Sequence, residues 1–336
     1  MKINFKFITP PQWILACILA LGLAFTFTSC SDGSSGGSDD DSGQVTATVP
    51  KIYATAENIT DKITSLSAGT HTITVTGEVN GILTRNGSNP SEIAAALIEL
   101  KKNCPDAKVI LDLSGTENLT EIPEHAFEGN SSYFTDNLVG VVLPNTVTSI
   151  GEDSFPRTGI TEISIPASVK SIEDYVFGYC SNLASVKLSE GLESIGGWAF
   201  RACYSLKSIV IPDSVTTLVF GTFEDCSSLT EVVIGSGVTE IPDTMFCGWS
   251  SLETIHIPTT VTKIGAGAFQ CALDAAEKSF TVKYAGTVED WNKIYVDMNA
   301  SSIMTTGAKN DALLKATIVC TDGKGTYEEL KNNIGQ

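Results

Sequence analysis

The feature that most constrains the fold of this chain is a repeat of 22 or 23 residues that begins at Leu138. Six consecutive units read LVGVVLPNTVTSIGEDSFPRTG, ITEISIPASVKSIEDYVFGYCSN, LASVKLSEGLESIGGWAFRACYS, LKSIVIPDSVTTLVFGTFEDCSS, LTEVVIGSGVTEIPDTMFCGWSS and LETIHIPTTVTKIGAGAFQCALD. A degenerate unit precedes them, with Leu111, Leu113, Ile122 and Phe127 in the corresponding roles. Self-similarity at such a period is typical of repeat proteins, in which each unit forms one structural coil.

Apolar residues occupy the same positions of every unit. The first, fourth and sixth positions, as in Leu252, Ile255 and Ile257, predict a short strand whose alternate side chains face one way. Pro follows this strand in four of the six units and ends it, because Pro lacks the amide donor that a ladder needs. Since one coil alone cannot bury these side chains, the pattern predicts stacked coils with a continuous core. Each unit closes on a phenylalanine: Phe155, Phe177, Phe200, Phe223, Phe246 and Phe269.

This pattern resembles the leucine-rich repeat, in particular the BspA-like (treponemal-type) variant with the unit L-x-x-I-x-I-P-x-S-V-x-x-I-G-x-x-A-F-x-x-C. The resemblance covers Leu138–Asp274 tightly and Leu111–Asn137 loosely. It implies an α/β solenoid of 23-residue coils, with a parallel sheet on the concave face, short helical or 3-10 turns on the convex side, and a cap at each end. In better-known leucine-rich repeats an Asn occupies the buried turn. Here hydroxyls or bare backbone must satisfy it, because the column holds Thr146, Ser168, Gly191, Ser214, Gly237 and Thr260.

The open ends of such a solenoid need covers. The segment NPSEIAAALIELKKNC predicts a helix, with Asn89 as N-cap, Pro90 at the first position and Glu92 completing a capping box. Alternating and apolar runs on both sides of the repeats predict the other cap elements. The expected elements are strands over 71–79 and 108–113, a helix over 89–104, a strand over 280–286, a short helix over 287–294 and a strand over 316–320.

The first thirty residues have the pattern of an export signal. Lys2 and Lys6 form a short basic region, and Trp13–Phe27 is mostly apolar. Its fifteen residues suit a signal-peptide core, whereas a membrane-spanning helix needs roughly 20 apolar residues.

The end of this stretch, FTFTSCSDGSSGG, resembles the lipobox of bacterial lipoproteins, although Phe27 stands where that family usually has Leu. The resemblance implies cleavage before Cys30 and attachment of diacylglycerol to its sulfur. An ordinary secretory signal with an incidental Cys is the alternative. Ser31–Gly43 contains only Ser, Gly and Asp and predicts a solvated tether; its acidic run Asp39–Asp41 reads as part of this spacer rather than as a cation site.

These features divide the chain into five predicted segments. They are a lipoprotein signal peptide over 1–29, the lipidated Cys and tether over 30–49, an N-terminal cap over 50–110, the repeats over 111–274 and a C-terminal cap over 275–336.

Three cysteines recur in register, at Cys180, Cys203 and Cys226. Coils stacked about 4.8 Å apart would place the outer two nearly 10 Å from each other. A zinc ion needs its thiolates within roughly 4 Å of one another, and no fourth ligand stands in the column. Neighbouring cysteines could reach a disulfide, but the next two units place Trp249 and Ala272 at this position. We therefore interpret the column as space-filling rather than metal-binding or redox-active.

The composition argues against several classes of function. A formal net charge of -18 disfavours nucleic-acid binding, which gains its affinity from basic residues that neutralise phosphates. The chain has only three histidines and no P-loop, G-x-S-x-G, H-E-x-x-H or C-x-x-C motif. Nothing in the sequence indicates an enzyme, a cofactor or a metal, although a hydrolase with convergent polar groups is kept as a hypothesis.

The third and fifth positions of each strand point away from the core and are the candidate binding surface. The fifth positions contain valines where a purely solvated face would have polar residues, and Val210 lies beside Val233. An exposed apolar strip can mark a partner site, but β-branched residues also simply suit strands. The candidate protein-binding residues are Val142, Ser164, Lys187, Val210, Val233, His256, Glu162 and Glu231.

The resemblance implies a non-catalytic, monomeric lipoprotein of the cell surface or outer membrane, which binds host proteins or cells. Its contact with the membrane would be through the N-terminal lipid only. The alternative is a scaffold protein of the envelope with a partner from the same cell.

Overall fold

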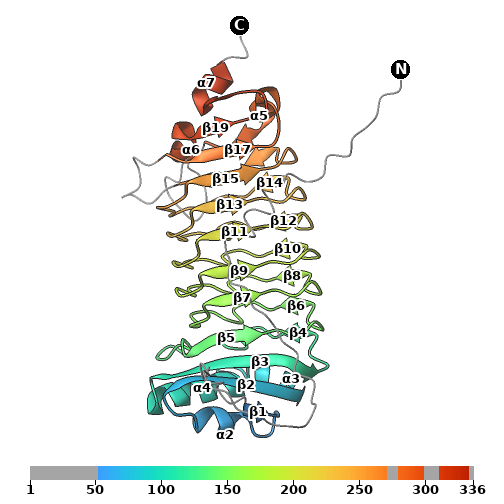
Figure 1. Cartoon of the computed structure of the whole chain (residues 1–336), viewed down its shortest axis with the longest axis vertical. Coiled ribbons are helices and arrows are strands. Elements are labelled where there is room, and N and C mark those ends of the chain that lie inside the picture. Colours follow the sequence, from blue (N-terminus) through green and yellow to red (C-terminus); the bar gives the residue numbers. More distant parts are fainter. Residues whose placement is uncertain (1–51, 271–278, 299–309, 333–336) are drawn as a thin grey trace, which may run out of the picture. The chain divides into compact units, whose positions relative to one another are not determined.

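The repeats fold into stacked coils, and each coil contributes one strand to each of two parallel walls (Figure 1). The computed structural model describes residues 52–270, 279–298 and 310–332. The predicted signal peptide, lipidation at Cys30 and tether lie outside the described residues. In the first wall, called the sheet wall, the coil strands are β5 (Leu138–Val142), β7 (Glu162–Ser164), β9 (Ser185–Lys187), β11 (Ser208–Val210), β13 (Glu231–Val233) and β15 (Thr254–Ile257).

The second wall consists of two-residue strands, which the sequence pattern did not predict. Most of them pair in parallel with their equivalents in the next coil, as Ser194 does with Thr217 and Ile195 with Leu218, but Thr217–Leu218 and Glu240–Ile241 belong to separate sheets. The strands are β4 (Glu121–Ile122), β6 (Ser149–Ile150), β8 (Ser171–Ile172), β10 (Ser194–Ile195), β12 (Thr217–Leu218), β14 (Glu240–Ile241) and β16 (Lys263–Ile264).

Consecutive tight turns form the third side of each coil, here called the turn wall. In this wall the structure assigns turns rather than regular helices between residues 119 and 270. The turns contain residues at positive φ, such as Tyr175 at 55° and Tyr179 at 62°, and a left-handed residue cannot continue a right-handed helix. Neighbouring turns are nevertheless joined by backbone hydrogen bonds, since the Phe177 N–H donates to the Ala199 carbonyl at 2.7 Å and the Phe200 N–H to the Thr222 carbonyl at 2.9 Å.

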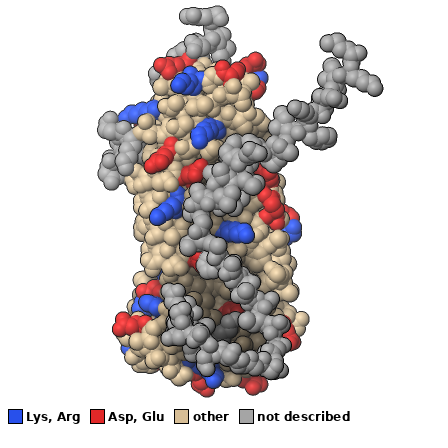
Figure 2. Space-filling model, viewed as in Figure 1, with Lys and Arg blue, Asp and Glu red and all other residues tan. Residues whose placement is uncertain are grey.

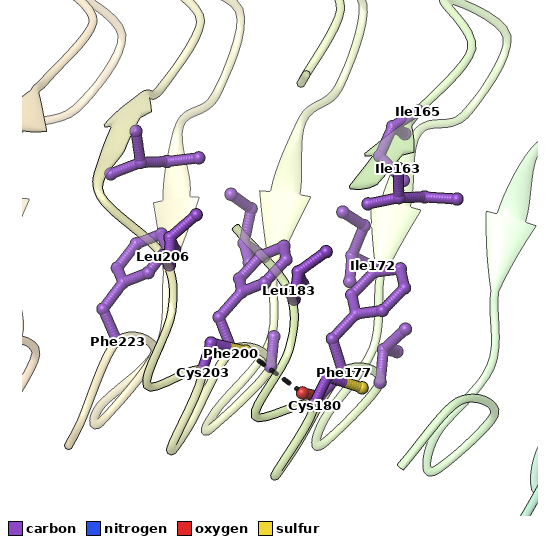
Figure 3. Packing of buried hydrophobic residues seen from close by; sticks show 14 of the residues in the cluster. Ile163, Ile165, Ile172, Phe177, Cys180, Leu183, Phe200, Cys203, Leu206 and Phe223 are labelled. Carbon is purple, nitrogen blue, oxygen red and sulfur yellow. Dashed lines mark hydrogen bonds between the residues drawn. The ribbon is translucent and has the colours of Figure 1, made fainter. Parts of the chain in front are cut away.

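The closing phenylalanines stack through the interior as a single ladder, which confirms the predicted core. Centroids of successive rings lie 4.8 Å apart for Phe127 and Phe155, and 5.3 Å apart for Phe177 and Phe200. These separations suit stacked rings, which gain about 0.5–1.5 kcal/mol beyond burial alone. Phe127 is fully buried, so the degenerate unit is a true coil of the stack. Figure 3 shows three of these rings in line.

Hydroxyl groups satisfy the buried turns at Thr146, Ser214 and Thr260, as the sequence predicted, whereas the buried Ser168 hydroxyl has no hydrogen-bond partner among the described residues. Thr146 Oγ1 donates to the Leu119 carbonyl at 2.7 Å, and Ser214 Oγ donates to the Leu192 carbonyl at the same distance. At Gly237 the backbone itself closes the turn, because a Cβ atom there would lie 2.3 Å from the Asp213 carbonyl oxygen.

The N-terminal cap extends the sheet wall in the order β1-β2-β3-β5. The predicted helix and strands are present, but the helix begins later than expected. Its N-cap is Ser91, whose side chain accepts a hydrogen bond from the Ala94 N–H at 3.1 Å. The prediction of Asn89 as N-cap was wrong, because Asn89 forms an isolated bridge with Asn86. With Ser91 as N-cap, Glu92 is the first helical residue and cannot complete a capping box, which needs the third. The elements are β1 (Ile52–Ala54), α2 (Ile59–Thr64), β2 (Gly69–Glu78), α3 (Asn80–Leu83), α4 (Glu92–Asn103) and β3 (Ala107–Glu117).

The C-terminal cap continues both walls before closing the open edge. Strand β17 pairs with β15, β18 pairs with β16, and β20 runs antiparallel to β19. An antiparallel final strand covers the edge that a parallel stack would expose. The predicted strand, helix and strand correspond to β17, α5 and β19. The elements are β17 (Thr281–Tyr284), α5 (Val288–Lys293), β18 (Tyr295–Val296), α6 (Asp311–Lys315), β19 (Thr317–Val319), β20 (Lys324–Thr326) and α7 (Tyr327–Asn332).

Candidate binding surfaces

The predicted sheet-face residues all lie on the solvent side of the sheet wall. Val142 is 47% exposed and Val210 is 55% exposed, whereas Val233 is half-buried. The polar members divide in the same way. Ser164, Lys187 and Glu162 are exposed, and Glu231 and His256 are half-buried.

The apolar strip consists of one valine pair, as the order of the repeat units predicted. Val210 and Val233 are directly opposite each other on adjacent strands. Val142, however, is separated from Val210 by the strands that carry Ser164 and Lys187. The structure therefore brings together one valine pair and leaves Val142 apart from it.

His256 lies next to this pair, in register with Val233. Its Nε2 atom is 3.4 Å from Glu231 Oε1, and only 12% of its side chain is exposed. Burial, and then the charge of Lys283 on the next strand, lower the pKa of His256, so the imidazole is neutral at pH 7. His256 therefore adds no positive charge beside the valine pair.

The cysteine column fills space beneath the turns and also donates hydrogen bonds. Cys203 Sγ donates to the Phe177 carbonyl at 3.3 Å (Figure 3), and Cys226 Sγ donates to the Phe200 carbonyl at 3.1 Å. Burial raises the pKa of the Cys180 thiol to about 11. Such a thiol is protonated at neutral pH and shielded from solvent, which leaves it unreactive.

Two other residue types replace Cys in this column and also donate to a phenylalanine carbonyl, but not to that of the preceding coil, to which each Cys donates. In the first coil, Thr158 Oγ1 donates to the Phe155 carbonyl at 3.0 Å. In the fifth coil, Trp249 Nε1 donates to the Phe269 carbonyl at 3.1 Å. Thr, Cys and Trp share a donor group rather than thiol chemistry, and this supports the packing interpretation.

A cluster on the turn wall was not predicted from the sequence. The aromatic–arginine cluster consists of Phe134, Arg157, Tyr175, Tyr179 and Arg201. The guanidinium carbon of Arg157 lies 4.9 Å from the Phe134 ring centroid and 5.1 Å from that of Tyr179. Arg201 lies over the same Tyr179 ring, at 5.7 Å. Such cation–π contacts hold both side chains against the wall.

Neighbouring coils support the cluster from one side. The rings of Tyr175 and Trp198 stack with centroids 5.0 Å apart. Trp198 Nε1 donates to Glu224 at 2.9 Å, and Arg201 Nη2 pairs with the same carboxylate at 3.1 Å.

A shallow hollow of about 220 Å³ lies within the cluster. Its lining includes Phe134, Arg157 and Tyr179 together with the carboxyl of Asp153. Burial and the nearby charge of Glu128 raise the pKa of Asp153 from its ordinary value of 3.8 to about 6. The sequence did contain a signal for this surface. The residues two positions before and two positions after the Phe that recurs in every coil, such as Tyr175 and Tyr179 around Phe177, differ from coil to coil, whereas the core positions repeat.

Charged residues of both signs are interspersed over the face seen in Figure 2. Among residues 52–270, 279–298 and 310–332, no three His, Cys, Asp or Glu side chains are placed to hold a metal ion. No helix in these same ranges has the length and apolar character needed to cross a membrane.

Comparison with solved structures finds leucine-rich repeat proteins. A leucine-rich repeat protein of T. pallidum is 28% identical, with 48% of this chain and 75% of that chain covered and a TM-score of 0.43. A leucine-rich cell surface protein from Faecalibacterium prausnitzii is 21% identical, with coverage of 74% and 86% and a TM-score of 0.31. A leucine-rich repeat protein from Bacteroides ovatus is 18% identical, with coverage of 67% and 81% and a TM-score of 0.32. No curated protein matches the chain.

The family comparison gives a direct match to the repeats. The model of the BspA type leucine rich repeat region matches six copies, over residues 108–219 and 148–276. Together these matches span residues 108–276, half of the 336-residue chain. They cover the coils whose phenylalanines, turn hydroxyls and parallel strands are described above. The chain belongs to the BspA-type leucine-rich repeat proteins.

Proposed function

We propose that this chain is a non-catalytic, lipid-anchored protein of the cell surface whose coils bind another protein through the solvent side of the sheet wall. One observation carries the proposal. Val210 is 55% exposed on β11 and lies directly opposite Val233 on β13. We take this apolar pair on a regular sheet as the centre of the contact surface, because exposed apolar patches mark protein interaction sites.

The surroundings of the pair have the composition of an interface rim. Lys187 on the preceding strand is exposed, and Glu231 lies half-buried on β13. Protein interfaces commonly place apolar residues at the centre and polar residues around them. The strands are also fixed in register by neighbouring coils, so the face needs little reordering on binding, which reduces the entropic cost.

The partner is tested by capture on immobilised protein, from host extracellular-matrix extract and from envelope of the producing bacterium. The test variant combines Val210→Lys and Val233→Lys, which introduces two charges into the apolar pair. The matched control combines Thr216→Lys and Thr239→Lys, two exposed residues in the same coils but on another side. We expect a partner that the wild-type protein and the control retain and the test variant loses. Equal retention by all three proteins would place the contact elsewhere.

Anchoring at Cys30 and exposure on the cell surface are parts of the same proposal. The first is tested by mass spectrometry of the mature N-terminus in wild-type protein and in Cys30→Ser, where a diacylglyceryl group on the wild-type sulfur alone is expected. The second is tested by protease treatment of intact cells. A chain that is cut only after the envelope is broken would favour the alternative, a scaffold with a partner from the same cell.

A further inference from the structure

We propose that the aromatic–arginine cluster is a second docking surface, in which Arg157 receives a carboxylate side chain of a protein partner. The cluster lies on the turn wall, so this proposal does not rest on binding by the sheet wall. It concerns a different set of residues, and variants of the two surfaces separate the two ideas.

The position of Arg157 is the first observation. Its guanidinium lies between the rings of Phe134 and Tyr179, at 4.9 and 5.1 Å from their centroids, and the side chain remains exposed. The rings cover the faces of the guanidinium and leave its N–H groups free. These N–H groups can form a bidentate pair with a carboxylate. Because the rings already restrict the side chain, little conformational entropy is lost when a ligand binds.

The second observation is that Arg157 forms no ion pair with the described residues, although its charge acts on the Asp153 carboxyl in the same hollow. Its side chain makes neither an ion pair nor a hydrogen bond with any of them. Other cations nearby are paired: Arg201 with Glu224 at 3.1 Å, and Arg85 with Glu128. Glu128 also lies 2.9 Å from His125 Nδ1, and it lines the same hollow as Arg157.

The third observation concerns the size and character of the site. The hollow of about 220 Å³ is smaller than the roughly 300–1,000 Å³ of ordinary small-molecule pockets. It can hold one side chain of a larger partner. Phe134 is 41% exposed and Tyr179 is 36% exposed beside it, and Arg and Tyr are the residue types that dominate binding energy in protein interfaces.

The backbone supplies a fourth observation. Arg157, Tyr175 and Tyr179 have φ values of 55°, 55° and 62°, in the left-handed region. That region costs a residue with a Cβ about 1–2 kcal/mol. Gly221, Gly248 and Gly267 avoid the cost in later coils, but Asp225 and Thr244 hold the same turn positions at φ values of 63° and 53°. Positive φ is therefore a general feature of these turns, and it sets the backbone from which Arg157, Tyr175 and Tyr179 project.

The test uses the full chain and a displayed library of random seven-residue peptides. We expect enriched peptides to carry Asp or Glu beside an aromatic or apolar residue. Arg157→Glu should weaken binding of a synthetic enriched peptide at least about thirty-fold, the effect of losing a strong interface contact. Arg157→Lys should give an intermediate loss, because Lys keeps the charge but lacks the planar fork.

Two controls separate this surface from other effects. Lys324→Glu makes the same change of charge on an exposed residue of β20 and should leave peptide binding unchanged. The Val210→Lys and Val233→Lys double variant should also bind the peptide normally, even if it loses the partner of the sheet wall. Thermal unfolding of each variant verifies that it is folded.

Several results would overturn the proposal. One is a selection without enrichment, and another is an enriched peptide that binds the Arg157→Glu chain as well as wild type. Arg157-dependent binding of acidic glycans on an array, without peptide binding, would identify a different class of partner. Peptide binding that is seen only after deletion of residues 31–43 would show that the chain's own acidic segment occupies the site.

Discussion

The buried phenylalanine ladder and the turn wall are built from the same 23-residue unit, but residue identity repeats in the ladder and varies in the turn wall. The ladder places a phenylalanine at the same point of every coil. Two residues earlier, on the turn wall, the chain carries Asp153, Tyr175, Trp198, Gly221, Thr244 and Gly267 in turn. Stacking imposes identity where each side chain must meet its equivalent in the next coil. Outside that contact the positions are free to differ, and the variation shows where a function can be placed.

The largest effect is expected from an interruption of the ladder. Phe200→Ala removes a ring that stacks on both Phe177 and Phe223 and leaves a cavity in a continuous core. The free energy of unfolding should fall by about 3–5 kcal/mol, measured by urea titration. Phe220→Ala is the matched control, because its half-buried ring only meets the edge of Trp198 on the turn wall. If both variants lost the same free energy of unfolding, the ladder would be no more important for stability than the turn wall.

A smaller effect is expected from the cysteine column. Cys203→Ala deletes the S–H donor to the Phe177 carbonyl, which keeps its backbone hydrogen bond from the Cys180 N–H. The loss of stability should be about 1 kcal/mol. Burial also raises the pKa of the Cys203 thiol well above its ordinary value. A thiol reagent should therefore label this residue only in unfolding conditions; rapid labelling of the folded protein would contradict the packing interpretation.

The turn wall should respond to pH through Asp153. Its pKa is raised by burial, and next by Glu128, from 3.8 to about 6, so the folded state binds this proton more tightly than the unfolded state. Its contribution to stability is present below pH 4 and is lost as the pH rises to about 6. Solvent screening limits the change to roughly 1 kcal/mol. Asp153→Asn should remove this part of the pH dependence, and an unchanged profile would assign the slope to other groups.

The smallest effect on stability is expected on the sheet face. The Val210→Lys and Val233→Lys double variant changes solvent-facing side chains, and its free energy of unfolding should fall by only about 0.5 kcal/mol. Urea titration measures this alongside Phe200→Ala. A loss of unfolding free energy as large as that of Phe200→Ala would show that the valine pair stabilises the fold.

The repeat made most of the fold predictable, because the same apolar columns recur in each coil and can only be buried by stacking. The cap helix shows the limit of local patterns. Asn and Ser are both favoured N-cap residues, so the sequence alone does not distinguish Asn89 from Ser91. The structure shows that the helix begins after Ser91. The second wall was missed because two-residue strands are too short to show alternation.

The surfaces were less predictable than the core. Alternation within each strand placed Val210 and Val233 outside correctly, since the period of a strand is two residues. The order of the units likewise placed Ser164 and Lys187 between Val142 and the pair. The aromatic–arginine cluster was missed because Phe134 lies in an irregular insertion of the degenerate coil, and no repeat position predicts that it reaches Arg157.

The central claim is that the sheet face binds a protein through the valine pair. The most direct test is the dissociation constant of the captured partner for wild type, for the Val210→Lys and Val233→Lys variant, and for the Thr216→Lys and Thr239→Lys control. We predict a loss of about thirty-fold or more in the first variant and none in the control, with all three proteins equally folded. Equal affinities across the three proteins would contradict the claim.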